Sequence, residues 1–280
     1  MLLADIAAIT RINKPTGALL LFWPCAYACC LTSDDLDFFL MLKFLLACFL
    51  ARTAGCIIND IVDKDIDAKV ERTKNRPLAK GSLSVNQALT ILGLVCCLGL
   101  IILCSLNFKA IICCLLSIPL VIVYPFMKRF TYLPQLFLGI TFNYGIFVVA
   151  MQNEQCLSLK IVILYIGCVF WTIAYDTIYG YMDLQDDKLI GVKSLSIFLE
   201  NTSPRFFIML FYLVFLFFFY LALYISQHGL NLLQIILGFF VMCYFFSQIS
   251  ELEMKCQKIC FNSFKGNNII ALILFIVTIV

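Results

Sequence analysis

Long apolar runs alternate with short polar segments along the whole chain. Most runs approach the roughly 20 residues that a helix needs to cross a bilayer, and two polar segments, residues 59–83 and 183–205, are longer than the rest. The fourth and the ninth run are short for a full crossing. We predict nine membrane-spanning helices, at residues 16–32, 38–58, 84–105, 109–124, 133–150, 159–181, 206–226, 229–249 and 267–280. The pattern therefore predicts an all-α, polytopic membrane helix bundle that forms a single transmembrane domain over residues 1–280.

Composition supports a membrane protein and excludes several kinds of site. Hydrophobic residues make up 63% of the chain and charged residues 13%, against roughly 45–50% and 25% in soluble domains. The net charge is only +3, and the bases form no patch suited to nucleic acid. The 15 cysteines lie mainly inside apolar runs, where a free cysteine packs as a small hydrophobe. His228 is the only histidine, which argues against histidine-based catalysis or metal binding.

The distribution of lysine and arginine predicts the orientation of the bundle. Most of the 20 basic residues fall in alternate loops when the N-terminus is placed in the cytoplasm. The other side has only Lys43, Lys109 and Lys160, while Arg52 lies inside a span. Both long polar segments then face the cytoplasm. No transit peptide is evident, which favours a bacterial inner membrane over a mitochondrial one.

The first long polar segment opens with acidic side chains at helical spacing. Asn59, Asp63 and Asp67 follow one another at intervals of four residues, so we expect them on one face at the end of the second span. Asp60 flanks that face, and Asp65 points elsewhere. The sequence thus predicts a row of oxygen ligands at the membrane boundary.

The second long polar segment also carries acidic side chains at helical spacing. Asp176, Tyr179 and Asp183 have helical spacing at the end of the sixth span, and Asp187 lies four residues beyond Asp183. Asp176 falls within an apolar run, where an ionisable residue indicates a functional site by default. Two helix ends on one side of the membrane therefore each present paired carboxylates.

These acids have two interpretations. Most charge runs are solvated loop residues, and exposed loops would screen the charges. In a sheltered site, however, carboxylates about 5–6 Å apart repel by roughly 3 kcal/mol per pair at an effective dielectric near 20. Divalent cations would remove that repulsion, and oxygen ligands without histidine or cysteine suit Mg²⁺, which completes its shell with water and substrate phosphates. We therefore expect a Mg²⁺–phosphate site.

Basic side chains follow each acidic group. Arginine offers a fork of donors to phosphate oxygens, so we favour a diphosphate-binding role for Arg72, Arg76 and Arg129. Other bases fit an ordinary accumulation of cytoplasmic charge, namely Lys74, Lys80 and Lys188. A diphosphate at the membrane boundary is reached most easily when it carries a tail that stays in lipid, so we expect an amphiphilic substrate.

Four segments carry a resemblance to a known family. Two segments resemble the Asp motifs of the UbiA intramembrane prenyltransferase superfamily: "NDIVDKDIDAKVERTKNRPLAKG" (residues 59–81) and "YDTIYGYMDLQDDKLIGVKS" (residues 175–194). Two further segments are similar to parts of its 4-hydroxybenzoate polyprenyltransferase branch: "RINKPTGALLLFWP" (residues 11–24) and "YPFMKRFTYLPQ" (residues 124–135). The match spans almost the entire chain in the expected order.

The resemblance implies a nine-helix bundle with a cytoplasm-facing cavity and a lateral opening for an isoprenoid chain. It implies that two Mg²⁺ ions are held by Asn59, Asp63, Asp67, Asp183 and Asp187, and that the four aspartates among these act in catalysis. It also implies diphosphate contacts from Arg72, Arg129 and Lys193. The family's motifs further include four positions to which we assign no role: Asp60, Arg76, Asp176 and Tyr179.

The sequence departs from the family pattern at two positions. Cys25 stands where threonine is usual, and Leu195 follows Ser194 where threonine is common. Neither residue is one of the carboxylates. These departures, with the short ninth span, therefore concern the fit of the acceptor and helix packing rather than the chemistry.

The expected reaction joins a polyprenyl group to 4-hydroxybenzoate in ubiquinone biosynthesis. The allylic C–O bond ionises, diphosphate leaves, and the ring carbon ortho to the hydroxyl attacks before the ring loses a proton. The acceptor carboxylate needs a cation or a hydrogen-bond donor, for which Asn13, Arg11 and Lys14 are candidates, although they can equally anchor the first helix. The partners are thus polyprenyl diphosphate, 4-hydroxybenzoate and the bilayer; we infer neither nucleic acid nor an obligatory protein partner.

Three alternatives remain open. The acceptor could instead be 1,4-dihydroxy-2-naphthoate, haem or homogentisate. A CDP-alcohol phosphotransferase also uses paired aspartates with Mg²⁺, but its motif requires Asp-Gly and Ala-Arg elements where this chain has Asp-Ile and Lys-Val. A metal-cation transporter would need acids near the midplane and an inverted repeat, whereas these acids gather at one face.

Overall fold

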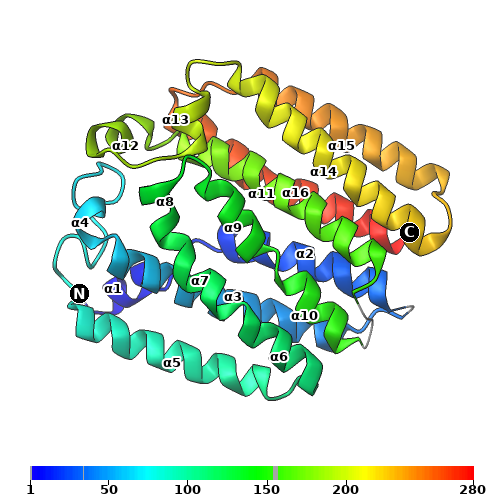
Figure 1. Ribbon diagram of the computed structural model, residues 1–280, viewed down its shortest axis with the longest axis horizontal. Helices are drawn as coiled ribbons and strands as arrows, with labels where there is room; N and C mark the ends of the chain where they lie inside the picture. The colour runs from blue at the N-terminus through cyan, green and yellow to red at the C-terminus, as the bar shows by residue number, and fades with distance from the viewer. Residues whose placement is uncertain (1, 34, 154–156) are drawn as a thin grey trace.

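A computed structural model describes residues 2–33, 35–153 and 157–280. Its helices lie side by side in one bundle (Figure 1), and the described residues contain no strand. Eight helical segments are long and apolar enough to cross a membrane, and α2 is a shorter apolar helix of 17 residues. The uninterrupted members are α2 (Thr16–Thr32), α3 (Phe38–Val62), α5 (Val85–Leu103), α11 (Leu159–Gly180), α14 (Pro204–Gln227), α15 (Leu232–Ser250) and α16 (Gln257–Ile279). The expected all-α membrane bundle is confirmed.

Two spans are built from shorter helices. Phe108–Phe130 consists of α6 (Phe108–Leu116), α7 (Ile118–Val123), η1 (Tyr124–Phe126) and α8 (Met127–Phe130). Pro134–Gln152 consists of α9 (Pro134–Phe142) and α10 (Gly145–Gln152). In the first of these, Pro125 lies in η1, two residues after the end of α7, where a residue without an N–H group interrupts the regular α-helical bonding.

The prediction that the fourth and ninth spans are short was wrong. The fourth extends to Phe130 and has 23 residues, and α16 begins at Gln257, ten residues before the expected start. The first turns of α16 carry polar residues that mask its apolar character in the sequence. Several of them are nevertheless buried by helix packing, among them Ser263 and Asn267.

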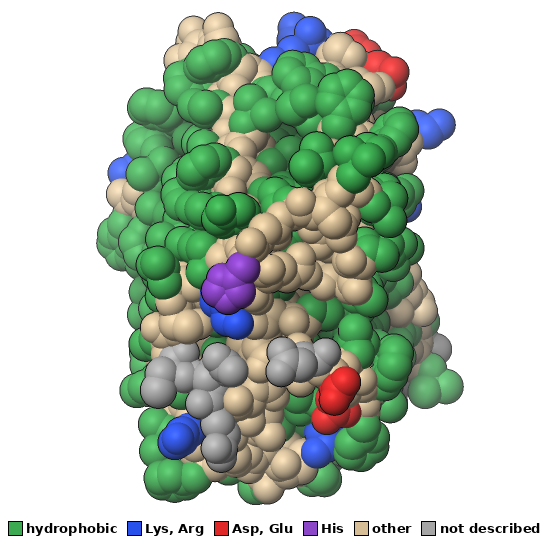
Figure 2. All heavy atoms as spheres, turned by 90° about the vertical axis from the view of Figure 1, so that its right-hand side faces the viewer, with side chains coloured by type: hydrophobic (Ala, Val, Ile, Leu, Met, Phe, Trp, Pro, Cys, Tyr) green, Lys and Arg blue, Asp and Glu red, His purple; other side chains and the backbone are tan. Residues whose placement is uncertain are grey.

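Four short helices lie outside the spans: α1 (Leu2–Ile9), α4 (Lys64–Asp67), α12 (Leu184–Ile190) and α13 (Leu195–Leu199). In Figure 1, α4, α12 and α13 gather at one end of the bundle together with the N-terminus, and the C-terminus lies at the other end. Figure 2 views that other end, where hydrophobic side chains predominate and charged ones are few and scattered. The bundle therefore has one polar end, formed by the two Asp-rich segments.

Helix α11 lies at the centre of the packed bundle. It makes its most extensive contacts with α14, and Trp171 is fully buried between α14 and α16. A Cβ atom at Gly167 would lie 2.9 Å from Phe218 Cβ and 3.3 Å from the Phe215 carbonyl oxygen. Only glycine therefore permits this close approach of α11 and α14, which fixes the height of the second Asp motif at the end of α11.

A buried asparagine joins three of these helices. The Oδ1 atom of Asn267 accepts hydrogen bonds from Trp171 Nε1 at 2.8 Å and from the Tyr212 hydroxyl at 3.1 Å, and its Nδ2 atom donates to the Ser263 carbonyl at 3.0 Å. These bonds link α16 to α11 and α14. The adjacent Asn268 accepts a single bond, from Trp23 Nε1 of α2, at 3.0 Å.

We predict that Asn267→Leu lowers the free energy of unfolding by about 1–2 kcal/mol, because two buried donors lose their shared acceptor. The measurement is reversible unfolding in mixed micelles. Asn268→Leu is the matched control and should cost about half as much, since only one bond is lost. Equal effects of the two changes would contradict a joining role for Asn267.

Candidate active site

The first Asp motif lies where α3 gives way to α4. Helix α3 ends at Val62, and Asp63 (φ −99°, ψ 7°) separates it from α4, so the continuous helical face expected here is interrupted at Asp63. The amide of Asp63 still donates to the Asn59 carbonyl at 2.8 Å, and that of Asp67 to the Asp63 carbonyl at 2.8 Å. The motif therefore keeps its four-residue spacing, and Asp63 and Asp67 are buried, with 1% and 6% exposure.

The second Asp motif occupies the turn from α11 to α12. Asp183 precedes α12, and the amide of Asp187 donates to its carbonyl at 2.9 Å. Helix α12 ends at Ile190 and is capped by Gly191, whose φ of 81° is one that glycine adopts without steric cost. This turn directs the chain back toward the bundle, so that Asp183 and Asp187 remain at the polar end.

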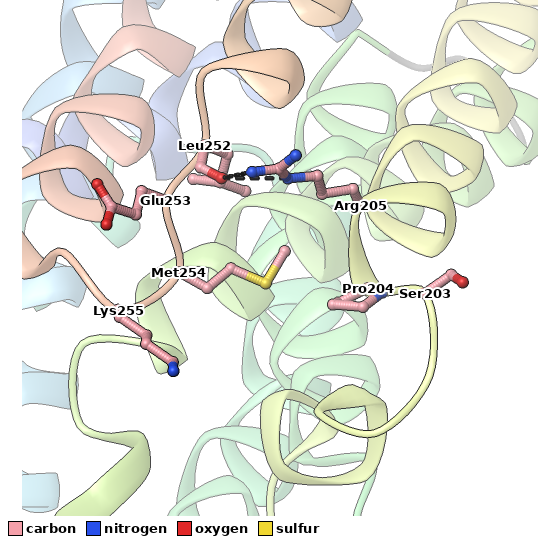
Figure 3. A pocket seen from close by; sticks show the side chains of 7 residues that line it. All are labelled: Ser203, Pro204, Arg205, Leu252, Glu253, Met254 and Lys255. Atoms are coloured by element: carbon pink, nitrogen blue, oxygen red, sulfur yellow. Dashed lines mark hydrogen bonds between the residues drawn. The ribbon is translucent and has the colours of Figure 1, made fainter.

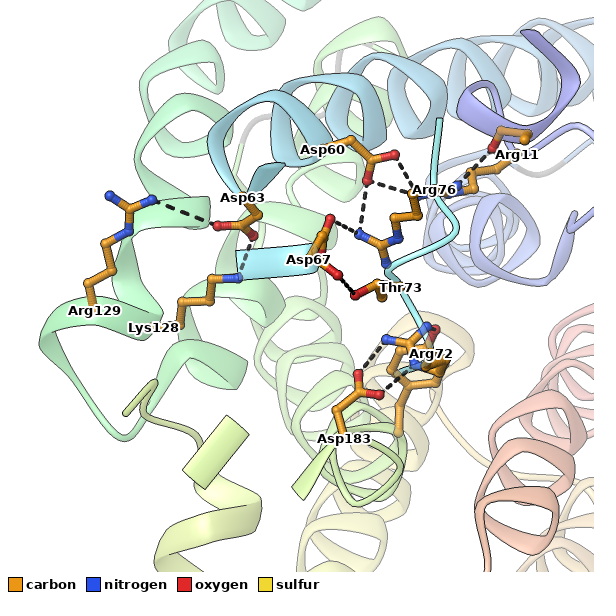
Figure 4. Close-up of polar contacts among 12 residues, drawn as sticks. Arg11, Asp60, Asp63, Asp67, Arg72, Thr73, Arg76, Lys128, Arg129 and Asp183 are labelled. Carbon is orange, nitrogen blue, oxygen red and sulfur yellow. Dashed lines mark hydrogen bonds and ion pairs between the residues drawn. The ribbon is translucent and has the colours of Figure 1, made fainter. Parts of the chain in front are cut away.

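One arginine joins the two motifs. Arg72 follows the first motif and pairs with Asp183 of the second through two hydrogen bonds, Nε to Oδ1 at 2.6 Å and Nη2 to Oδ2 (Figure 4). Its Nη1 atom donates to the Tyr179 hydroxyl at 2.8 Å. The Glu71 amide also donates to Asp186 Oδ2 at 2.9 Å. The two Asp-rich segments, far apart in sequence, are thus cross-linked by this short stretch.

A second arginine holds the first motif together. Arg76 Nη1 contacts Asp60 Oδ1 at 3.0 Å and Asp67 Oδ2 at 2.6 Å. Arg11 Nη2 binds both carboxylate oxygens of Asp60, at 2.8 and 2.7 Å, from a left-handed backbone conformation with φ of 57°. Asp60 is 2% exposed and is therefore neutralised by two arginines from different parts of the chain.

The segment that precedes α9 contributes a lysine to the site. Lys128 Nζ pairs with Asp63 Oδ2, whereas the neighbouring Arg129 Nη2 lies 3.9 Å from Asp63 Oδ1 and donates to the Val62 carbonyl at 3.1 Å. The sequence prediction favoured Arg129 because of its fork geometry. Lys128 was missed, since only the fold shows which of two adjacent bases on α8 turns toward α3.

Lys193 lies beside this segment rather than among the acids. Its amide donates to the Lys128 carbonyl at 2.8 Å, and its Nζ atom donates to the Phe130 carbonyl at 3.3 Å while lying 5.5 Å from the centre of the Tyr132 ring. Lys193 thus fixes the backbone that carries Lys128. The three lysines expected to be ordinary surface charges each pair with an acid other than the aspartates of the two motifs: Lys74 with Glu71, Lys80 with Asp5, and Lys188 with Glu200.

Asn13 and Lys14 lie exposed at the turn before α2. Partial burial and neighbouring positive charges lower the pKa of Lys14; these charges belong to Arg11, Arg72, Arg76 and Lys265. Two cations of the first motif, together with Arg11 and Lys265, therefore create a positive potential that reaches Lys14. Such a potential favours an anion at this end of the bundle.

Two charged residues lie within the apolar part of the bundle, and the sequence prediction assigned no role to either of them. Asp176 of α11 has Arg52 of α3 as its charged neighbour. Arg52 lies 5.5 Å from the centre of the Phe142 ring, so close to α2 that a Cβ atom at Gly17 would lie 2.8 Å from its Nε atom. Among the described residues Arg52 has no ion pair within 4.0 Å. The aromatic hydroxyls in its field belong to Tyr124, Tyr175 and Tyr179.

The signal for Arg52 was present in the sequence. It lies well inside its predicted span, whereas Lys43, Lys109 and Lys160 fall within the first six residues of theirs, and an ionisable residue at that depth marks a functional site by default. The field of Arg52 includes Tyr179, the residue whose hydroxyl accepts a hydrogen bond from Arg72.

The carboxylates fit a divalent cation by their chemistry. Asp63 Oδ1 is buried without a hydrogen-bond partner. Burial and the charge of Asp183 raise the pKa of Asp187 to about 7, and a bound cation would relieve both penalties. Within the described part of the chain, no three acidic, histidine or cysteine side chains converge on one point, because Asp60, Asp63, Asp67 and Asp183 each pair with a base.

Fold and site together define a class: a multi-pass membrane protein with acids and bases gathered at one end of its bundle. The UbiA prenyltransferase family matches residues 21–269, and the chain belongs to that family. It is 35% identical over 276 residues to the 4-hydroxybenzoate octaprenyltransferase of Marinomonas sp., an alignment that covers 98% of this chain and 96% of the relative.

Solved structures give the same fold. The apo structure of a UbiA homolog from Aeropyrum pernix K1 superposes with a TM-score of 0.76 at 22% identity, over 93% of this chain and 96% of that one. A UbiA homolog from Archaeoglobus fulgidus bound to DMAPP and Mg²⁺ superposes with a TM-score of 0.73 at 14% identity, over 98% of each chain. The helical arrangement is therefore that of the UbiA fold.

We predict that Arg72→Gln accelerates amide exchange in residues 181–193, because the two-bond contact with Asp183 no longer ties the second motif to the first. Hydrogen exchange with mass spectrometry measures this directly. Lys74→Gln is the matched control, since Lys74 pairs only with the exposed Glu71, and it should leave the exchange unchanged. Equal exchange in the two variants would show that Arg72 does not hold the segments together.

Proposed function

We propose that the chain transfers a polyprenyl group from polyprenyl diphosphate to the ring carbon of 4-hydroxybenzoate ortho to the hydroxyl, releasing diphosphate, in ubiquinone biosynthesis. The observation that carries this proposal is the similarity over 98% of the chain to a protein named for octaprenyl transfer to 4-hydroxybenzoate. The ring of acids and bases at the polar end supports it, because a diphosphate needs both a metal and cations.

The diphosphate lies, in this proposal, between the two Asp motifs. Arg72 and Lys128 already face this space from opposite sides, where they pair with Asp183 and Asp63. When a diphosphate carries its own divalent cations to the carboxylates, these two bases are released to bind its oxygens. Arg76 stays with Asp60 and Asp67 and keeps the first motif in shape.

We propose Mg²⁺ as the divalent ion, and support comes from the Archaeoglobus homolog solved with DMAPP and Mg²⁺. The residues that would hold it are Asn59, Asp63, Asp67, Asp183 and Asp187. When bound, the ion neutralises the diphosphate and so favours its departure. The chain's own groups position the diphosphate at the membrane boundary, with the prenyl tail among the apolar helices.

The acceptor lies, in this proposal, deeper than the diphosphate. Arg52 is a cation in an apolar interior, and a carboxylate is the partner that such a site favours. We therefore propose that Arg52 binds the carboxylate of 4-hydroxybenzoate and thereby directs the ring toward the allylic carbon near Tyr179. This gives to Arg52 the role for which the sequence suggested Asn13, Arg11 and Lys14, because Arg11 is engaged by Asp60 and the other two are exposed.

The reaction then needs little covalent participation from the protein. Cations stabilise the negative charge that develops as the allylic C–O bond breaks, and the aromatic walls of the bundle keep water from the carbocation-like centre. The electron-rich ring carbon attacks, and loss of its proton restores the aromatic ring. We also propose that the chain acts as one prenyltransferase domain in a bacterial inner membrane, with residues 59–83 and 183–205 in the cytoplasm.

The direct test is mass spectrometry of the product formed by purified membranes given 4-hydroxybenzoate, polyprenyl diphosphates of mixed length and Mg²⁺. The expected product is a 3-polyprenyl-4-hydroxybenzoate. Parallel reactions with 1,4-dihydroxy-2-naphthoate, haem and homogentisate test the other acceptors. Preferential conversion of one of these would replace the proposed acceptor while keeping the class of reaction.

We predict that Asp63→Ala and Asp183→Ala each abolish prenyl transfer while the protein still inserts into membranes, because each motif loses a carboxylate that faces the diphosphate. Asp65→Ala is the matched control, since Asp65 lies in the same motif but is exposed. Initial rates in membranes provide the measurement. Substantial activity in both site variants, or full activity in EDTA, would rule out the proposed metal site.

We predict that Arg52→Gln raises the KM for 4-hydroxybenzoate by about 10- to 100-fold, the effect expected from loss of a charge-assisted contact, and leaves the KM for polyprenyl diphosphate nearly unchanged. The variant should also lose the preference for 4-hydroxybenzoate over 4-hydroxybenzamide, which lacks the charge. An equal rise in both KM values would indicate a general defect of the cavity instead.

A further inference from the structure

A cavity separate from the two Asp motifs lies at the same end of the bundle (Figure 3). It has a volume of about 460 Å³ and lies between the start of α14 and the linker that joins α15 to α16. Seven residues line it: Ser203, Pro204, Arg205, Leu252, Glu253, Met254 and Lys255. None of them belongs to the motifs of the proposed reaction.

The cavity has two cations that the described part of the chain leaves without an acidic partner. Arg205 donates from Nε and Nη2 to the Leu252 carbonyl at 3.2 and 2.8 Å, and neither Arg205 nor Lys255 has a carboxylate within 4.0 Å among the described residues. Glu253 extends from the far side of the linker, away from Arg205, in Figure 3. A guanidinium has five N–H donors, so Arg205 can bind an anion while it keeps its carbonyl contact.

The start of α14 adds to the positive potential. Pro204 occupies the first turn, and Ser203 makes no side-chain cap to this helix of 24 residues. The N-terminus of a helix carries a partial positive charge, so a basic residue in the first turn is unfavourable unless an anion lies nearby. Arg205 lies at that position, and Lys255 approaches from the opposite wall.

The depth of the cavity identifies the kind of anion. It lies where the spans α14 and α16 begin and α15 ends, at the boundary of the apolar part of the bundle. Its inner wall is apolar, with Leu252 fully buried and the Met254 side chain directed into the space. On the two helices that adjoin it, α14 and α15, Phe206 and Phe246 are 63% and 53% exposed. A phosphate at this depth with apolar chains alongside is the arrangement of a phospholipid.

We propose that this cavity binds the headgroup of an anionic phospholipid, with the phosphate between Arg205 and Lys255 and the acyl chains along the exposed faces of α14 and α15. Basic pockets between transmembrane helices are suited to such headgroups. A free phosphate would gain the same charge contacts but none of the contacts with the helix faces. The lipid would also tie the linker Leu252–Lys255 to α14, on the side of the bundle away from α3.

Native mass spectrometry of the purified full-length protein in detergent tests the proposal. Phosphatidylglycerol should be retained in preference to phosphatidylcholine of the same chain length, because only the former carries a net negative charge. Arg205→Gln and Lys255→Gln should each weaken its retention by about fivefold, the effect of one basic residue at an anionic lipid surface. Lys109→Gln removes an exposed charge at the opposite end of the bundle and should have no effect.

Three results would overturn the proposal. Equal retention of the two lipids would exclude recognition of charge, and unchanged retention of phosphatidylglycerol in both cavity variants would place the lipid elsewhere. Full competition by inorganic phosphate at the same concentration would indicate a soluble anion as the ligand. Lys255 makes no hydrogen bond within the described chain, so Lys255→Gln reports on the site even if loss of the Arg205–Leu252 contact disturbs folding; prenyl transfer in detergent confirms that each variant is intact.

Discussion

The compensation of buried carboxylates by bases is the constraint on which the polar end of this protein depends. Asp60, Asp63 and Asp67 are at most 6% exposed at the edge of an apolar bundle, where unpaired charges would be costly. Arginine and lysine from other segments meet each of them, and these contacts determine where the flanking loops run. The ion pairs that compensate these acids therefore largely determine the arrangement of the loops around the proposed site.

The same constraint explains how stability and ligand binding are combined. Asp60 has two arginine partners, and both of its carboxylate oxygens are hydrogen-bonded, so it serves the fold. Asp63 has one oxygen without a hydrogen bond, and the pKa of Asp187 is raised to about 7, so these two acids remain incompletely compensated. Within one cluster, the fully paired acids hold the loops and the incompletely paired ones are available to a cation.

Much of the fold followed from the sequence because apolar length and helical spacing are local properties. The Asp motifs kept their four-residue intervals even though α3 ends between Asn59 and Asp63. The start of α16 could not be predicted in this way, since Asn267 is polar in the sequence but is buried through bonds to Trp171 and Tyr212. The partner of each acid was also hidden: choosing Lys128 over Arg129, or recognising Arg52, requires knowing which helices become neighbours.

The cross-link between Arg72 and Asp183 has a consequence for the biogenesis of the protein. Asp60 and Asp67 find their arginines within the first 76 residues, so these two acids can be neutralised while later helices are still being synthesised. Asp63, in contrast, waits for Lys128, and Arg72 waits for a partner 111 residues further along the chain. Part of the first motif can thus form early during membrane insertion. The complete site forms only after α11 has joined the bundle.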